Sequence, residues 1–241
     1  MKWISVITHT VLFAGLVVLL AFTNIRHDNK MCKDYRIDMG DAKGSLITQG
    51  EIILLMESIS DSIVGKPITQ LPLFEIESKI EQQKNIENAE VYVTLDGRLQ
   101  IDVKEKEPIV RVKSVNQKEF YMDKEGAIFD LSSNYTKRLL VANGNIKDSL
   151  DLSSITALAN HINGDPFLKS QIIQIYIKEN KEIELIPRVG NHNILLGRID
   201  GYKEKFKKLK LFYSEGVKQT GWNNYKEINL KFKDQIVCVK K

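Results

Sequence analysis

The stretch near the start of the chain constrains its structure most, because it suits only an apolar environment. Residues Trp3 to Phe22 include no Asp, Glu, Lys or Arg, and Val11 to Phe22 is apolar throughout. About twenty helical residues span the roughly 30 Å hydrocarbon core of a bilayer. The sequence therefore predicts one transmembrane helix over residues 3–23, preceded by a short cytoplasmic tail, residues 1–2.

A cleaved signal peptide is the competing interpretation of this stretch. Lys2 supplies only a thin positive region before it, and Leu20-Ala21-Phe22-Thr23 lacks the small-x-small pattern of a cleavage site. Under either interpretation the rest of the chain leaves the cytoplasm. The positive-inside rule taken alone would keep it inside, although the rule weakens for so short a tail. The rule compares the basic residues on the two sides of the stretch: Lys2 precedes it, and Arg26, Lys30, Lys33 and Arg36 follow it.

The remaining chain has the composition of a packed protein. The 241-residue sequence is 43% hydrophobic and 27% charged, and no later stretch is apolar enough to cross a membrane. Its 35 basic and 31 acidic residues are interspersed, which suggests solvation and argues against a nucleic-acid surface. Two cysteines, Cys32 and Cys238, do not make a disulfide framework. A bridge between them would need an oxidising compartment and is not our expectation.

After a polar linker over residues 24–36, the pattern predicts a small domain over residues 37–108. A short strand begins it, and Thr48-Gln49-Gly50-Glu51 fits the capping box that starts a helix. A second helical pattern runs from about Leu73 to Gln83. The period then changes to alternation, with Asp96-Gly97 as a two-residue turn between strands. The predicted order is strand, helix, helix, strand, strand, with both helices on one face of the sheet.

Residues 109–241 have the pattern of a mixed β-domain. Alternating stretches typical of strands surround two helical stretches, Ser153–Asn163 and the strongly amphipathic Ile199–Glu215. Two predicted strands come last, Tyr225–Phe232 and Gln235–Val239, joined by a tight Lys233-Asp234 turn. The predicted fold class is therefore α+β: a transmembrane helix, a small domain, and a β-domain with two packed helices.

The residues offer little for catalysis. The sequence contains no His-x-x-x-His, Cys-x-x-Cys, Gly-x-Ser-x-Gly or phosphate-binding loop. His161, Asp165 and Ser170 are near neighbours in sequence, but such neighbours occur by chance in any chain. The lysines of the Ile199–Glu215 helix are typical of a solvated face with a Glu204–Lys208 pair. We therefore expect no enzyme activity, metal, cofactor, small-molecule substrate or nucleic acid.

The last predicted strand is unusual because it is apolar on both faces. It comprises Ile236-Val237-Cys238-Val239 and is followed by Lys240-Lys241. A strand with one neighbour leaves unpaired amides and carbonyls on its other edge, where a partner chain can add a strand. In the alternative, the strand pairs within its own sheet and the lysines guard against aggregation. The spacing of the residues leaves these two interpretations equal.

Three motifs have an order and a spacing that point to one family. Leu99 to Pro108 fits L-x-I-x-V-x-E-x-x-P, and Phe120 to Phe129 fits Y-x-x-D-x-x-G-x-x-F with Phe120 for the leading Tyr. Ile228 to Phe232 fits a D-L-R-Y strand, with Asn, Lys and Phe replacing Asp, Arg and Tyr. These motifs resemble those of the bacterial cell-division family FtsQ, called DivIB in other lineages. The resemblance covers essentially the whole chain and implies a transmembrane helix, a POTRA domain and a β-domain.

The resemblance also implies a function. It implies a non-enzymatic bitopic scaffold of the inner (plasma) membrane at the division site, with a cytoplasmic N-terminus and an extracytoplasmic body. The last strands would bind the FtsB/FtsL (DivIC) coiled-coil pair by main-chain pairing and so help control septal wall synthesis. Proline at Val237 is expected to remove a donor from that edge. The implied partner-binding residues are Lys231, Phe232, Gln235, Ile236, Val237, Cys238 and Val239.

Two other functions are alternatives. The first is a POTRA-bearing envelope factor that chaperones outer-membrane protein assembly or secretion. Such factors usually include a long barrel of alternating strands, which this sequence does not contain. The second is a membrane-tethered hydrolase, which would need a nucleophile and a base that the sequence does not supply.

Overall fold

Two compact units make up the computed structural model of the chain, Met1–Glu105 and Lys106–Lys241. The structure describes residues 9, 11–18, 30–40, 44–60, 62–115, 118–216 and 221–241. The cytoplasmic tail, most of the transmembrane helix predicted over residues 3–23 and residues 24–29 of the predicted linker lie outside these residues. His9 and residues 11–18 are helical. No helix in the described part of the chain combines the length and apolar character that a membrane crossing requires.

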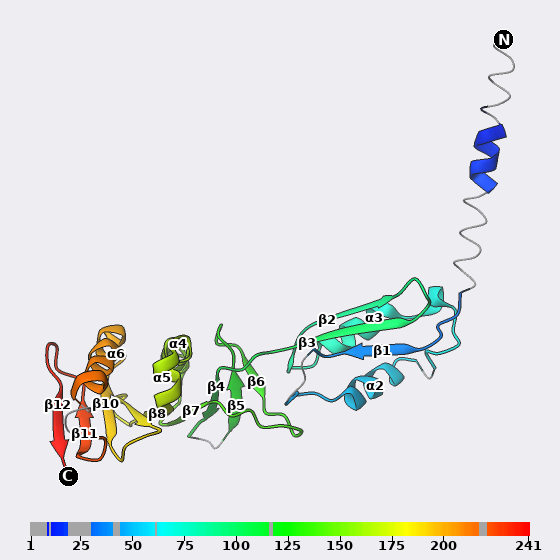
Figure 1. The fold of residues 1–241 in the computed structure, drawn as a ribbon. Helices are drawn as coiled ribbons and strands as arrows, with labels where there is room; N and C mark the ends of the chain where they lie inside the picture. Colours follow the sequence, from blue (N-terminus) through cyan, green and yellow to red (C-terminus); the bar gives the residue numbers. More distant parts are fainter. Residues whose placement is uncertain are drawn as a thin grey trace. The chain divides into compact units, whose positions relative to one another are not determined.

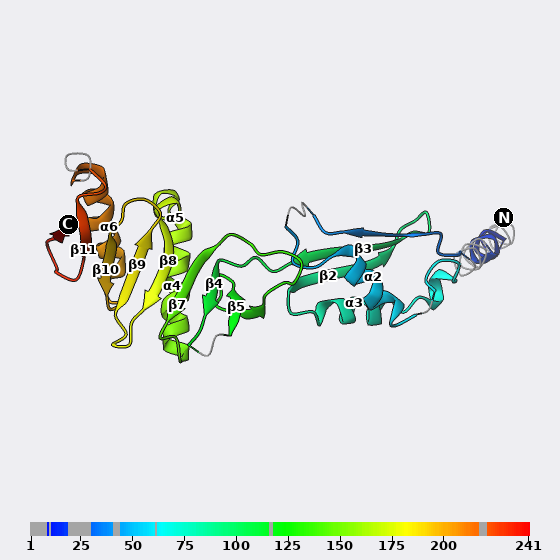
Figure 2. The same cartoon turned by 90° about the horizontal axis from the view of Figure 1, so that it is seen from below.

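The first unit is a three-stranded sheet covered on one face by helices (Figures 1 and 2). The strand order is β1-β3-β2, with β1 parallel and β2 antiparallel to β3. The predicted order strand, helix, helix, strand, strand is present. The elements are β1 (Tyr35–Asp38), α2 (Gln49–Glu57), a 3₁₀ turn (Ile68–Gln70), α3 (Leu73–Glu81), β2 (Ile86–Val93) and β3 (Leu99–Glu105).

Helix α2 begins where the capping box predicts. The Glu51 amide donates to the Thr48 hydroxyl at 3.2 Å, and the Thr48 amide donates to the Glu51 carboxylate at 2.7 Å. These bonds satisfy two of the amides that a helix start leaves without partners. Ile52, in the next turn, is fully buried in the core of this unit.

Two local features of the first unit differ from the sequence prediction. Strand β1 includes Tyr35 and Arg36, which the sequence placed in the linker, because they pair with β3. The β2–β3 connection is longer than the predicted two-residue turn. Thr94 and Arg98 hydrogen-bond to each other across it, so residues 95–97 form the turn. Gly97 takes a φ of +89° there, a conformation that glycine adopts at little cost.

The second unit is built on a nine-stranded mixed sheet with the order β12-β11-β10-β9-β8-β7-β4-β5-β6. Its strands are β4 (Val110–Lys113), β5 (Glu119–Met122), β6 (Ile128–Asp130), β7 (Leu140–Gly144), β8 (Ile172–Ile177), β9 (Ile183–Pro187), β10 (Asn193–Gly197), β11 (Tyr225–Asn229) and β12 (Val237–Lys240). Its helical elements are α4 (Ser149–Gly164), α5 (Pro166–Gln171), α6 (Tyr202–Leu211) and a π-helical turn (Phe212–Gly216).

Helices α4, α5 and α6 lie along the same side of this sheet (Figure 1). Ile155 of α4 and Phe206 of α6 are buried against it. On β4, Val110 and Val112 face this core while Arg111 is half-buried on the opposite face. The sheet therefore has one face covered by helices. Parallel pairing of β7 with β8 and of β10 with β11 follows from the helical crossovers that join them.

The sequence predicted two packed helices, and the structure adds α5 between them. Pro166 occupies the first position of α5, where its missing amide is no loss. Asp165 caps this helix by accepting from the amides of Phe167 and Leu168 at 2.9 and 3.0 Å. The helix predicted from Ile199 begins instead at Tyr202, after Gly201 with a φ of +64°.

The connection between β11 and β12 is longer than the predicted tight turn. Strand β11 ends at Asn229, and β12 begins only at Val237. The Leu230 amide still donates to the Leu195 carbonyl at 2.9 Å, so the chain follows β10 for one more residue before it turns away. Residues 230–236 therefore form an extended connection.

Candidate partner-binding edge

Strand β12 is the edge strand of the nine-stranded sheet. It pairs antiparallel with β11, and its other edge pairs with no described strand. Cys238 lies opposite Ile228 and faces the core, whereas Val237 and Val239 share the uncovered face and are 39% and 47% exposed. The sequence left open whether the last strand has a free edge. In the structure the outer edge of β12 is free of any described strand.

Alternation along β12 decides which amides face outward. The Lys241 amide donates to the Asn224 carbonyl on the β11 side at 3.1 Å. Successive amides of a strand point to opposite sides, and the register irregularity in this pair lies on β11. The amides of Val239 and Val237 therefore face β11, and those of Cys238 and Lys240 face outward. The expectation that proline at Val237 removes an outward donor is wrong, because the Val237 amide faces β11. Proline at Cys238 is the substitution that removes an outward donor.

The seven residues implied by the resemblance occupy different positions. Val237, Cys238 and Val239 lie on β12, whereas Gln235 and Ile236 precede it and Ile236 packs against the core. Phe232 is 45% exposed on the β11–β12 connection. Lys231, on the same connection, reaches back to Glu182 at 3.1 Å. The structure thus gathers three of these residues on the free strand and the rest on the segment leading into it.

Lys208 of α6 supports this connection, a role that no sequence pattern indicated. Its ammonium donates to the carbonyls of Leu230 at 3.4 Å, Lys233 at 3.0 Å and Phe232. The predicted Glu204–Lys208 pair is absent from the ion pairs of the described residues, where Glu204 lies 3.6 Å from Lys207 instead. Lys208 therefore holds the segment that precedes β12. Other lysines of the face predicted to be solvated also make contacts, because Lys205 donates to the Arg198 carbonyl at 2.7 Å and Lys210 pairs with Asp165.

A buried histidine lies beside the start of β11. His192 is 3% exposed, its Nε2 lies 2.8 Å from the Tyr213 hydroxyl, and its Nδ1 makes no hydrogen bond of standard geometry. Burial lowers the pKa of His192, the positive charge of Lys241 lowers it further, and the Trp222 carbonyl opposes them. Burial likewise raises the pKa of Tyr213. Both groups are therefore held neutral.

Acidification is expected to destabilise the second unit through His192. The unfolded chain binds a proton near pH 6.5, whereas the folded chain resists it, so stability falls as the pH drops below about 6.5. Thermal unfolding of wild type and His192→Gln at neutral and mildly acidic pH measures this. The glutamine amide keeps a partner for Tyr213 but does not titrate. The melting temperature of His192→Gln should therefore depend less on pH than that of wild type.

The control for this experiment is His161→Gln. Partial burial also lowers the pKa of His161, which packs on Tyr202 and Phe206 with ring centroids 5.3 and 5.0 Å away. If the His161 variant alone flattens the pH dependence, the assignment to His192 is wrong.

The free edge of β2 in the first unit is closed in a way that β12 is not. The Val91 amide donates to Glu77 Oε2 at 3.0 Å, and the Ala89 amide donates to Glu81 Oε1 at 3.3 Å. Both carboxylates come from α3, one helical turn apart. A backbone amide that already has a charged acceptor is a poor site for adding a strand. The capped amides of β2 are therefore those of Val91 and Ala89, whereas the outward amides of Cys238 and Lys240 on β12 donate to no carboxylate among the described residues.

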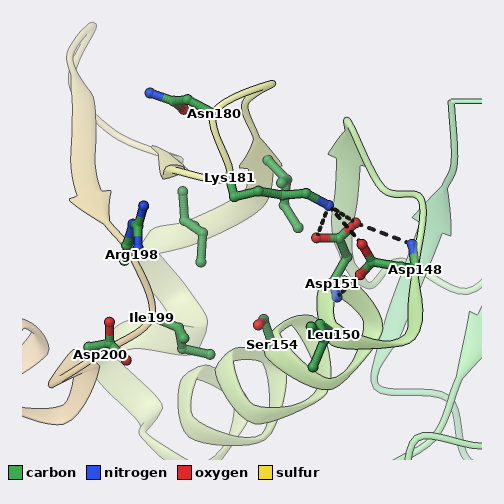
Figure 3. A pocket seen from close by; sticks show the side chains of 11 residues that line it. Asp148, Leu150, Asp151, Ser154, Asn180, Lys181, Arg198, Ile199 and Asp200 are labelled. Carbon is green, nitrogen blue, oxygen red and sulfur yellow. Dashed lines mark hydrogen bonds and ion pairs between the residues drawn. The ribbon is translucent and has the colours of Figure 1, made fainter.

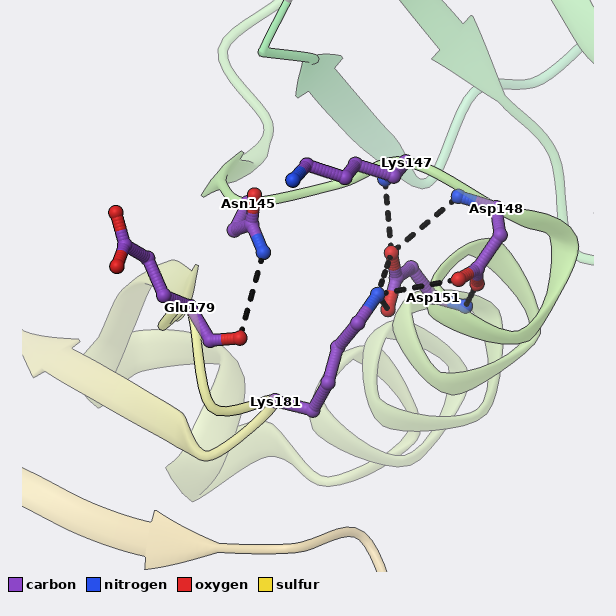
Figure 4. Close-up of polar contacts among 6 residues, drawn as sticks. All are labelled: Asn145, Lys147, Asp148, Asp151, Glu179 and Lys181. Atoms are coloured by element: carbon purple, nitrogen blue, oxygen red, sulfur yellow. Dashed lines mark hydrogen bonds and ion pairs between the residues drawn. The ribbon is translucent and has the colours of Figure 1, made fainter.

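A network of charges joins the β8–β9 turn to the start of α4 (Figure 4). Lys181 has a φ of +64°, and its ammonium lies 2.6 and 2.7 Å from the oxygens of Asp151 and 3.1 Å from Asp148. Asp151 is buried and also accepts from the Lys147 amide at 2.8 Å. The Asp151 carboxylate, then that of Asp148, raises the pKa of Lys181. The network fixes the turn in place.

A cavity of about 310 Å³ opens beside this network (Figure 3). Ser154 is the hydroxyl that lines it, and Asp151, the nearest candidate base, is tied to Lys181. The grouping of His161, Asp165 and Ser170 does not form a site either. Asp165 pairs with Lys210, and Ser170 donates to the Phe167 carbonyl at 2.7 Å. Among the residues the structure describes, no cluster of His, Cys, Asp and Glu would hold a metal, and both cysteines are free.

The second unit carries the comparison that decides the family. The family described as "FtsQ/DivIB, C-terminal related" matches residues 107–239, more than half of the chain. The chain belongs to the FtsQ/DivIB family. The POTRA-like domain family matches residues 30–104, within the first unit. None of the curated proteins compared with the chain matches it.

Membership of the FtsQ/DivIB family makes this chain a cell-division scaffold in general terms. FtsQ/DivIB proteins are non-enzymatic, and the family suggests a membrane protein of the division site that binds other division proteins. The POTRA-like match and the large mixed sheet confirm the α+β part of the predicted fold class. The transmembrane helix of that prediction is not among the described helices. The alternative of an outer-membrane assembly factor is not favoured.

Proposed function

We propose that the chain is a bitopic, non-enzymatic scaffold that recruits an FtsB/FtsL (DivIC)-type coiled-coil pair through the free edge of β12. In this proposal residues 3–23 anchor it in the inner (plasma) membrane with the N-terminus in the cytoplasm. The POTRA domain, residues 37–108, and the β-domain, residues 109–241, lie outside the cytoplasm. The observation that carries the proposal is the position of β12, which pairs on one side only with a strand of the described chain.

The recruiting contact is a strand added to β12. The outward amides of Cys238 and Lys240 would bond to the carbonyls of the partner strand, and main-chain pairing would supply most of the affinity. Val237 and Val239, exposed on the uncovered face, would contact its side chains and give specificity. Phe232 is the exposed aromatic residue nearest to the strand in sequence and would act as an anchor.

The alternative of a POTRA-bearing assembly factor predicts a different contact. A chaperone of unfolded strands would offer an open edge on its POTRA domain, but Glu77 and Glu81 occupy the outward amides of Val91 and Ala89 on β2. This capping favours the division scaffold over the chaperone.

Truncation of the full chain after Asp234 is expected to abolish both partner co-purification and rescue of septation. The truncation removes β12 and leaves β11 as the new edge of the sheet. Co-purification with the coiled-coil pair and the mid-cell band of a fluorescent fusion measure the two effects. The matched control is the double substitution Lys240→Ser with Lys241→Ser, which keeps the backbone and should behave as wild type. A diffuse envelope signal for the wild-type fusion would support the assembly factor instead.

A further inference from the structure

A second cavity in the second unit gathers positive charge. It has a volume of about 420 Å³ and lies where α4 ends, between the segment before β4, the start of β8 and the end of β9. Three basic residues line it: Arg138 before β7, Lys169 on α5 and Arg188 just after β9. We call it the basic cavity. It shares no residue with the β12 edge.

The three cations of the basic cavity have no carboxylate partner. None of them forms an ion pair with a described residue, and Glu107 is the one carboxylate in the lining. In the same unit Arg111 pairs with Glu119, and Lys178 pairs with Glu184 at 2.7 Å. The lining of the basic cavity has three cations and one carboxylate, so it carries an excess of positive charge that no described residue neutralises through an ion pair.

One of the three cations is already oriented. Arg188 Nε donates to the Ser170 carbonyl at 3.0 Å, which fixes the plane of the guanidinium and leaves its terminal nitrogens available. Arg138 and Lys169 approach from other segments of the chain. Guanidinium groups hold planar pairs of oxygens, and an ammonium adds a point charge. The lining brings two guanidinium groups and one ammonium together from three segments of the chain, and that number of donors suits a tetrahedral anion with several free oxygens better than a carboxylate with two.

We propose that the basic cavity binds a phosphate group. Arg138 and Arg188 would each hold phosphate oxygens in a fork, and Lys169 would neutralise the remaining charge. Apolar residues of the same lining, including Leu139 and Ile173, would contact the part of the ligand that carries the phosphate. A soluble phosphate ester and a phospholipid headgroup have this chemistry in common.

Titration of the full chain with inorganic pyrophosphate by calorimetry tests the proposal. Saturable binding is expected for wild type, and the double variant Arg138→Ala with Arg188→Ala should bind about tenfold or more weakly, because two charge-assisted contacts are lost. The matched control is Arg198→Ala, which removes an exposed arginine of the same unit outside the cavity and should change nothing. The variant Arg138→Lys with Arg188→Lys keeps the charge but loses the forks, so it should fall between wild type and the alanine variant.

The outcomes separate the proposal from its rivals. If wild type shows no saturable binding, or if Arg198→Ala weakens it as much as the cavity variant, the proposal is overturned. Hexaglutamate binding that is stronger than pyrophosphate binding and depends on the same residues would overturn the phosphate assignment in favour of an acidic peptide. Co-sedimentation with phosphatidylglycerol vesicles but not phosphatidylcholine vesicles, lost in the cavity variant, would identify a lipid headgroup. Pyrophosphate binding without vesicle binding would identify a soluble ligand. Thermal unfolding of each variant reports whether it is folded.

Discussion

Replacing Cys238 with proline is expected to weaken binding of the coiled-coil partner by about 100-fold while the β-domain stays folded. The Cys238 amide faces outward, so proline removes a donor that the β12–β11 pair does not use. The partner carbonyl that would have accepted from it is left without a bond, and the proline ring occupies the space of the incoming strand. Titration of the full chain with the coiled-coil pair measures the loss.

Two companion variants make this result specific to the backbone. Cys238→Ala removes the thiol and keeps the amide, so it should bind as wild type does. Val237→Pro removes an amide that faces β11, so it should lower the melting temperature, which Cys238→Pro should leave nearly unchanged. Full binding by a folded Cys238→Pro variant would show that the partner does not pair with this edge.

Replacing both Glu77 and Glu81 with alanine is expected to open the edge of β2 and make the protein self-associate. Each substitution removes a charged acceptor from an outward amide, at 3.0 Å for Val91 and 3.3 Å for Ala89. An exposed edge with free donors is a template for pairing with another copy. Sedimentation should show concentration-dependent dimers or larger species, and amide hydrogen exchange at Ala89 and Val91 should accelerate by about tenfold.

Glu75→Ala is the control for the β2 edge. Glu75 is exposed in the first turn of the same helix, so its loss changes net charge and leaves both capped amides intact. Equal self-association in this control would assign the effect to charge alone. A double variant that stays monomeric with unchanged exchange would show that the carboxylates do not protect the edge.

Local signals with a direct chemical meaning predicted much of the fold. The capping box at Thr48 and Glu51 marks the start of α2, and alternation marks β3. The missed helix α5 shows the limit of such signals. Pro166 can either end a helix or begin one, and the choice depends on Asp165 capping the next turn, which spacing alone does not reveal.

The candidate site was less predictable because it depends on pairing between segments. The spacing of the residues left open whether the final strand has a free edge, and the structure places β12 at the edge of the sheet. Which amide faces outward depends on the register irregularity between Tyr225 and Glu227 and on the bond from Lys241 to Asn224. The role of Lys208 could not be predicted either, because its acceptors lie more than twenty residues away in sequence.

The shortness of β12 sets how the proposed scaffold would work. Four residues extend over about 13 Å, and two outward amides, those of Cys238 and Lys240, supply few bonds, each worth about 1 kcal/mol net. A contact of that size between two freely diffusing molecules would dissociate often. When both proteins are tethered to one membrane, their effective concentration rises, and the same contact is formed for a larger fraction of the time. Cutting either tether should therefore release the complex without altering a single contact in it.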